Sequence, residues 1–75
     1  MDRIDNIKFL TELSIQKIIG FIVEDNNVEY DEAFHTVYLS ETFQKLNDPS
    51  TGLYRESAAY VYEIFKSEIQ NGKIN

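Results

Sequence analysis

The chain has 75 residues, a formal net charge of −6 and a hydrophobic content of 43%. A chain this short supports one hydrophobic core, and its apolar content argues against disorder, so we predict a single domain over residues 1–75. The absence of cysteine excludes disulfides and thiolate zinc sites. The apolar runs are too short for a membrane span or a signal peptide, so we predict a cytoplasmic protein.

The first predicted helix runs from about Asp2, its expected N-cap, to Glu24. One apolar stripe at helical spacing is predicted to face the core. It comprises Ile4, Ile7, Ser14, Ile15, Ile18 and Ile22. A second apolar line lies on the opposite face and comprises Phe9, Leu13, Gly20 and Val23. A helix that is apolar on two faces is either central in its domain or shared with a partner, and Gly20 would allow another helix to approach closely.

Two short helices are predicted next. Asp31 is the expected N-cap of the first, which ends near Leu39, and Ser40 is the expected N-cap of the second, which ends near Leu46. Pro49 cannot continue that helix. The aromatic and apolar residues of the first short helix share one face; they are Tyr30, Phe34, Val37 and Tyr38.

The last predicted helix begins near Tyr54 and ends at Gly72, a good C-terminal cap. Tyr60 and Tyr62 lie at the two margins of its apolar arc, and tyrosines at such margins suit protein interfaces. The predicted fold is therefore all-α, a single small bundle of about four helices, two long and two short. The predicted core comprises Ile15, Ile18, Ile22, Phe34, Val37, Phe43, Leu46, Leu53, Val61, Ile64 and Phe65.

Catalytic and metal-binding patterns are incomplete. The stretch from Glu24 to Glu32 has oxygen ligands at alternating positions, as in a calcium loop, but Tyr30 stands where glycine is needed and Thr36 where a bidentate glutamate is needed. His35, the only histidine, has no identifiable partner for acid–base or metal chemistry. We therefore predict no enzyme activity, no cofactor and no metal.

The two short middle helices also allow a nucleic-acid interpretation. Their arrangement can imitate a helix-turn-helix whose reading helix presents Gln44 and Asn47. The seven basic residues are scattered, however, and Glu41 and Asp48 would face phosphates. Because DNA affinity depends mainly on neutralising phosphates, the charge argues against this alternative. A small ligand-binding domain is a further alternative.

The second half of the chain carries a recognisable pattern. The run SETFQKLNDPSTGLYRES at residues 40–57, followed by YVYE at 60–63, resembles short all-helical bacterial proteins of unassigned function. Some of those proteins occur in gene clusters that resemble toxin–antitoxin loci. The resemblance implies a structural motif, in which a helix end, a Pro-x-Thr-Gly turn and a helix start follow one another. It implies a bacterial accessory protein and no catalytic residue.

Together these features predict a non-enzymatic protein-interaction or accessory module that either self-associates or binds a basic partner protein. The second apolar line of the first helix and the tyrosines at the margins of the last helix are the predicted interface. Its candidate residues are Phe9, Leu13, Gly20, Val23, Tyr60 and Tyr62.

Overall fold

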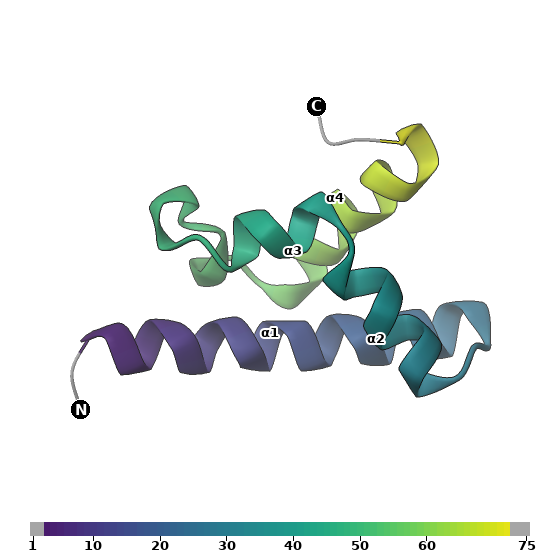
Figure 1. The fold of residues 1–75 in the computed structure, drawn as a ribbon, viewed down its shortest axis with the longest axis horizontal. Coiled ribbons are helices and arrows are strands. Elements are labelled where there is room, and N and C mark those ends of the chain that lie inside the picture. Colours follow the sequence, from purple (N-terminus) through teal and green to yellow (C-terminus); the bar gives the residue numbers. More distant parts are fainter. Residues whose placement is uncertain (1–2, 73–75) are drawn as a thin grey trace.

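The computed structural model describes residues 3–72, which form four α-helices and two short 3-10 helices (Figure 1). The elements in chain order are α1 (Arg3–Asn26), α2 (Tyr30–Tyr38), α3 (Glu41–Leu46), η1 (Pro49–Thr51), η2 (Leu53–Arg55) and α4 (Ala58–Asn71). No strand occurs among these residues. The prediction of a small all-α bundle with two longer and two shorter helices is confirmed.

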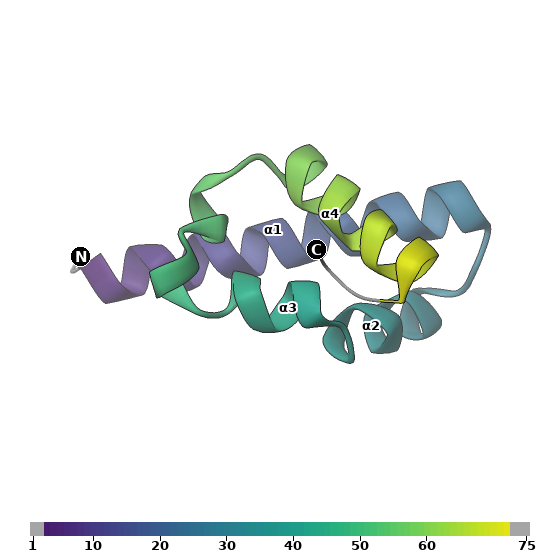
Figure 2. The same ribbon diagram turned by 90° about the horizontal axis from the view of Figure 1, so that it is seen from above.

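The long helix α1 sets the shape of the molecule. Its 24 residues make a rod of about 36 Å at 1.5 Å per residue, close to the longest dimension of 37 Å. Seen from above, α2 and α3 run along one side of α1, while α4 crosses over it (Figure 2). Both α2 and α4 contact α1, and α3 contacts α4. The long helix α1 is therefore the element against which α2, η2 and α4 pack.

The core follows this arrangement. Most of the predicted core is buried, namely Ile15, Ile18, Ile22, Val37, Leu46, Val61 and Phe65. Phe34, Phe43 and Leu53 are partly buried and pack against the core, and Ile64 is half-buried. Three further core residues were not predicted: Ile19, Ala33 and Tyr62. The first half of α1 contributes little to the core, because Phe9, Leu10 and Leu13 remain exposed there.

One of the two N-caps predicted for the middle helices is confirmed, and the other is not. Ser40 caps α3 as predicted, since its side chain accepts a hydrogen bond from the Phe43 amide at 3.0 Å. The prediction for Asp31 was wrong, because α2 begins at Tyr30 and Glu29 occupies the N-cap position. Asp31 lies in the first turn, where a carboxylate is also favoured by the helix dipole, so the sequence alone does not separate the two positions.

The start of α4 also differs from the prediction. The helix begins at Ala58 rather than near Tyr54, and Ser57 caps it by accepting from the Tyr60 amide at 3.1 Å. Tyr54 lies instead in the 3-10 helix η2, because Gly52 adopts the left-handed conformation (φ 71°) and redirects the chain. Gly72 ends α4 with a φ of 81°, as predicted. Asp2, the expected cap of the first helix, lies outside the described residues.

The segment between α3 and α4 is held by its own side chains. The Asp48 carboxylate accepts hydrogen bonds from the Ser50 hydroxyl and amide, which lower the pKa of Asp48. The Thr51 hydroxyl donates to the Lys45 carbonyl at 2.6 Å and accepts from the Leu53 amide. These contacts fix the turns between α3 and α4 by local hydrogen bonding.

Candidate interaction surface

The second apolar line of α1 is largely exposed. Phe9 is 63% exposed and Leu13 is 41% exposed. Gly20 is also exposed, and a Cβ atom built there would meet no atom within 4 Å. Val23 departs from the prediction, because it is partly buried against the core. We call the exposed part of this line, with Gln16 between its members, the outer α1 face: Phe9, Leu13, Gln16 and Gly20.

The two predicted interface tyrosines of α4 have different surroundings. Tyr60 is 53% exposed, whereas Tyr62 is buried, with 7% of its surface exposed. The Tyr62 hydroxyl donates to the Asp25 carboxylate at 2.7 Å, and its ring packs against the rings of Phe21 and Phe65. The prediction that Tyr62 belongs to an interface was therefore wrong. A hydroxyl that reaches a carboxylate at the core margin lets a tyrosine serve as a core residue.

The environment of Tyr62 also changes its acidity. Burial raises the pKa of Tyr62, and the hydrogen bond to Asp25 and the negative charges of Asp25 and Glu63 raise it further, to about 12. The Lys66 ammonium lies 4.8 Å from the centre of the same ring. This side chain therefore ties α4 to the end of α1 while remaining neutral.

Four aromatic rings form a continuous row along α2 and onto α3. Tyr30, Phe34 and Tyr38 are four residues apart and share one side of α2. The ring centres of Phe34 and Tyr38 are 4.2 Å apart, and those of Tyr38 and Phe43 are 4.3 Å apart. Tyr30 extends the row at 6.5 Å from Phe34. We call these residues the aromatic face: Tyr30, Phe34, Tyr38 and Phe43.

The aromatic face is partly open to solvent. Phe34 and Phe43 pack against the core, whereas Tyr30 is 50% exposed and Tyr38 is 39% exposed. Leu39, which follows Tyr38 at the corner between α2 and α3, is 85% exposed. The sequence showed the spacing of these rings but not the depth of their burial, because burial depends on how α2 packs against the rest of the bundle.

The aromatic face joins the outer α1 face through one hydrogen bond. The Tyr30 hydroxyl donates to the Gln16 side-chain oxygen at 2.9 Å. Gln16 lies one turn after Leu13 and one turn before Gly20 on the same face of α1.

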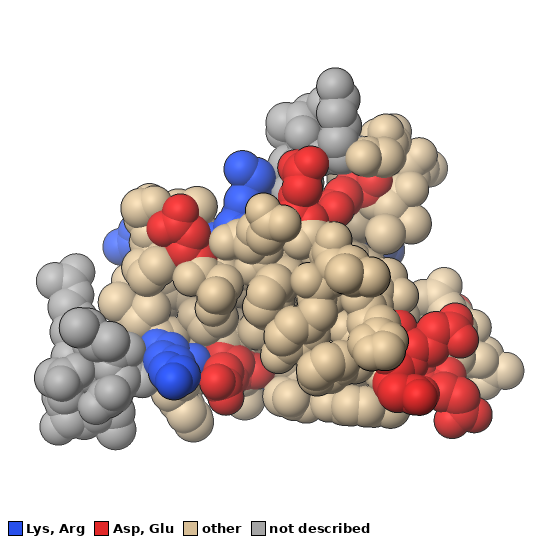
Figure 3. Space-filling view, in the orientation of Figure 1, with Lys and Arg blue, Asp and Glu red and all other residues tan. Residues whose placement is uncertain are grey.

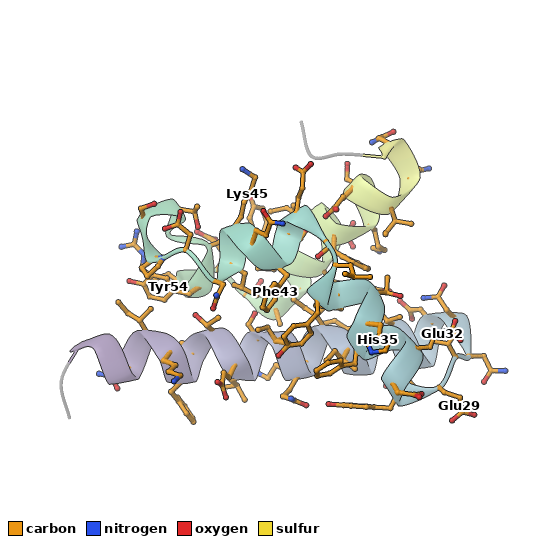
Figure 4. The ribbon with its side chains drawn as sticks, in the orientation of Figure 1. Glu29, Glu32, His35, Phe43, Lys45 and Tyr54 are labelled. Atoms are coloured by element: carbon orange, nitrogen blue, oxygen red, sulfur yellow. The ribbon has the colours of Figure 1, made fainter. Side chains whose placement is uncertain are left out.

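The view in Figure 4 shows Phe43 on the near side of α3 and His35 on the near side of α2, while Lys45 projects from the upper edge.

A side chain of α4 fixes the corner between α2 and α3 through hydrogen bonds. The Glu68 carboxylate accepts hydrogen bonds from the Glu41 amide at 2.8 Å, from the Thr42 amide at 3.0 Å and from the Thr42 hydroxyl at 2.8 Å. Burial alone would raise the pKa of Glu68, but these hydrogen bonds outweigh it and hold the pKa below its ordinary value. With Ser40 capping Phe43, the first three amides of α3 are all paired within the protein.

This capping bears on the helix-turn-helix interpretation. A reading helix approaches DNA with its N-terminal residues, where free amides and the helix dipole favour phosphate. In this structure the Glu68 carboxylate occupies that end of α3. The carboxylate adds negative charge where a phosphate would lie, so the geometry argues against nucleic-acid docking through α3.

The negative charge is concentrated in one part of the chain. Residues 18–44 contain six carboxylates and no lysine or arginine. The carboxylates are Glu24, Asp25, Glu29, Asp31, Glu32 and Glu41. Elsewhere seven acidic residues balance the seven basic ones, so the whole net charge of −6 belongs to this segment. Acidic side chains gather at the right-hand end of the face in Figure 3, where Figure 4 labels Glu29 and Glu32, and an uncharged band lies beside them.

The carboxylates of the stretch from Glu24 to Glu32 do not converge on one point. Asp25 accepts from Tyr62, and Asp31 accepts from the Glu32 amide within α2. Among residues 3–72, no three histidine, aspartate or glutamate side chains come together as metal ligands.

A shallow groove lies on another side of α1. Its volume is about 330 Å³, and Leu10, Ser14, Lys17, Tyr54 and Arg55 are among its lining residues. The Ser14 hydroxyl oxygen is buried and has no hydrogen-bond partner within the part of the chain that the structure describes. An unpaired buried hydroxyl costs free energy of folding, so Ser14 marks a packing cost at the lining of this groove.

Comparisons with models of known protein families, with curated proteins and with solved structures gave no match. None of the helices within residues 3–72 is long and apolar enough to cross a membrane.

Proposed function

We propose that the chain is a non-enzymatic interaction module that docks onto another protein through the aromatic face and the adjoining outer α1 face. The observation that carries the proposal is the row of four ring side chains, in which Tyr30 is 50% exposed and Tyr38 is 39% exposed although it stacks between Phe34 and Phe43. Small soluble domains rarely leave contiguous apolar surface uncovered unless it binds something. This role agrees with the accessory function in a bacterial cytoplasm that we expect from the sequence.

The chemistry of this surface suits protein recognition. Tyrosine provides a large contact area and a hydroxyl that tolerates water, so it serves both free and bound states. Each 100 Å² of apolar surface removed from water contributes about 2.5 kcal/mol before the costs of association. Stacking fixes the rings of Phe34, Tyr38 and Phe43 in advance, so little side-chain freedom remains to be lost on docking.

A pair of matched double variants tests the location of the surface. Tyr38→Ser with Leu39→Ser removes a tyrosine and an aliphatic side chain from the α2–α3 corner. Tyr60→Ser with Ile69→Ser removes the same kinds of exposed side chain from α4. The tagged wild-type chain and both variants are used to capture proteins from lysate of the native host, and each capture is quantified by mass spectrometry. Circular dichroism confirms that both variants keep their helices.

We expect the corner variant to lose at least nine-tenths of any stoichiometric partner and the α4 variant to retain it. Capture that depends on Tyr60 and Ile69 instead would move the docking surface to α4 and contradict the proposal. A wild-type chain that captures no partner and stays monomeric at high concentration would also contradict it.

A further inference from the structure

We infer that the occupant of the aromatic face is a basic segment of another protein, in which arginine or lysine side chains lie over the exposed rings. The inference rests on the proposed function and specifies the partner of that same surface. Three observations carry it: the distribution of charge along the chain, the exposure of the rings, and the absence of any lysine or arginine among the residues that build α2.

The negative charge of the chain lies in the same segment as the aromatic face. All four residues of the aromatic face lie within residues 18–44, the segment that holds the whole net charge of −6. Glu29 and Glu32 lie at the start of α2, beside Tyr30, and Figure 4 places them at the same end of the molecule. Lys17 and Lys45 bound the segment in sequence; Lys17 lines the groove on another side of α1, and Lys45 projects from the upper edge of α3. No internal cation of this segment therefore neutralises its carboxylates.

The aromatic rings provide a second attraction for a basic segment, in addition to the negative charge. A cation over an aromatic face is attracted by the ring quadrupole, and arginine also stacks its planar guanidinium on the ring. The molecule already makes this contact elsewhere, since the Arg55 guanidinium lies 5.7 Å from the Tyr54 ring centre and Lys66 lies over Tyr62. Tyr30 exposes about half of its surface without such a cation, and its nearest ring centre is 6.5 Å away. Tyr38 is stacked between Phe34 and Phe43 and presents only the remaining part of its side chain to the partner.

The same charges disfavour a second copy of this chain as the occupant. A symmetric dimer places the same patch of both copies in contact. Pairing through the aromatic face would bring together two segments that each carry six carboxylates and no lysine or arginine. Like charges at an interface oppose association, whereas a basic partner gains from the same carboxylates and is steered toward them.

The test uses nona-arginine as the probe and amide chemical shifts of the full chain as the readout. We expect shift changes gathered in α2 and the start of α3, with residues of α4 unaffected. The affinity should weaken as salt rises from 50 to 300 mM, because exposed charge pairs are screened.

Two double variants of equal charge separate local recognition from non-specific attraction. Glu29→Gln with Glu32→Gln should weaken binding about fivefold, from two exposed charge contacts. Glu56→Gln with Glu63→Gln removes the same charge from residues outside the segment and should change the affinity less than twofold. The Tyr38→Ser, Leu39→Ser variant should weaken binding about threefold through the lost ring contact.

The outcomes distinguish this inference from the proposed function. Equal weakening by both charge variants, or shifts spread over α4, would reduce the binding to general attraction and overturn the inference. If nona-arginine leaves α2 unshifted while a host partner is still captured through Tyr38 and Leu39, the inference fails and the proposed function stands. If the corner variant captures that partner as well as the wild type does, both fail.

Discussion

Glu68 is the side chain through which α4 holds the start of α3. Replacing it with alanine leaves two α3 amides and the Thr42 hydroxyl without their partner. We expect Glu68→Ala to lower the free energy of unfolding by about 1–3 kcal/mol, as for other lost caps and charged hydrogen bonds. Urea unfolding followed by circular dichroism measures the change. Glu63→Ala, which removes only an exposed pair with Lys66, is the matched control and should stay within about 0.5 kcal/mol.

The contribution of Glu68 depends on pH in a defined direction. Its pKa in the folded protein is lowered from the ordinary value of 4.5, so the folded state binds fewer protons than the unfolded state near that pH. The stability that Glu68 provides is therefore complete above pH 4.5 and is lost as the pH falls through the folded pKa. We expect the difference in urea midpoint between wild type and Glu68→Ala to be constant at neutral pH and to close in acid. A difference that persists unchanged at pH 3 would contradict this.

Tyr62 is expected to act at the opposite end of the pH scale. Its pKa is about 12 in the folded protein against an ordinary value of 10.0, so the folded state retains a proton that the unfolded state loses. The associated stability is complete below pH 10 and declines as the pH rises toward 12. Absorbance of tyrosinate should show a late ionisation that is missing in Tyr62→Phe. If the two titrations coincide, the buried position of Tyr62 is contradicted.

Two leucines near α3 test how the burial of a side chain determines the stability that is lost when it is truncated. Leu46 is 1% exposed and Leu39 is 85% exposed. We expect Leu46→Ala to cost about 2–5 kcal/mol, because it leaves a cavity in the core, and Leu39→Ala to stay within about 0.5 kcal/mol. Thermal or urea unfolding of both variants gives the comparison. A large loss for Leu39→Ala would mean that the side chain supports the fold and is not available for docking.

At the scale of elements, two glycines with different roles give a matched pair. A Cβ at Gly20 meets open space inside α1, so Gly20→Ala should raise the free energy of unfolding by about 0.5–1 kcal/mol. Gly52 has a φ of 71°, and a Cβ there lies 2.7 Å from an Arg55 nitrogen. Gly52→Ala should therefore lower the free energy of unfolding by at least about 1 kcal/mol. A rise of the unfolding midpoint for Gly20→Ala and a fall for Gly52→Ala would confirm both assignments.

The features of the helices that could be predicted from the sequence were those that depend on residues close by in the chain. Ser40 and Gly72 act within one turn of a helix end, so their residue types identified the caps of α3 and α4. The contact of Glu68 with Thr42 spans 26 residues, and that of Tyr62 with Asp25 spans 37. No local pattern reports such contacts, which is why Tyr62 was predicted for an interface and Glu68 was not singled out.

Only part of the candidate surface could be predicted from the sequence. The exposure of Phe9 and Leu13 followed from helical periodicity, because the opposite face of α1 carries the isoleucines of the core. The aromatic face depends on where α2 comes to rest against α1, and helical spacing does not fix that placement. The sequence placed Tyr30, Phe34 and Tyr38 on one side of a helix, but only the packed structure shows that this side lies at the edge of the core.

At the scale of the whole molecule, the structure separates stability from recognition. The second half of α1, α4 and the buried sides of α2 and α3 supply the core. The first half of α1 and the outer sides of α2 and α3 leave exposed apolar side chains that the fold does not use. Because the core and the exposed side chains are distinct, variants of the surface should change docking without changing folding.

The most direct measurement is hydroxyl-radical footprinting of the tyrosines in lysate of the native host and in the purified protein. We expect Tyr30 and Tyr38 to lose reactivity in the lysate, where a partner covers the aromatic face, while Tyr60 reacts equally in both. Buried Tyr62 should be unreactive throughout and serves as the internal control. Equal reactivity of Tyr38 in the two samples, with protection appearing at Tyr60 instead, would contradict the central claim that this protein docks through α2 and α3.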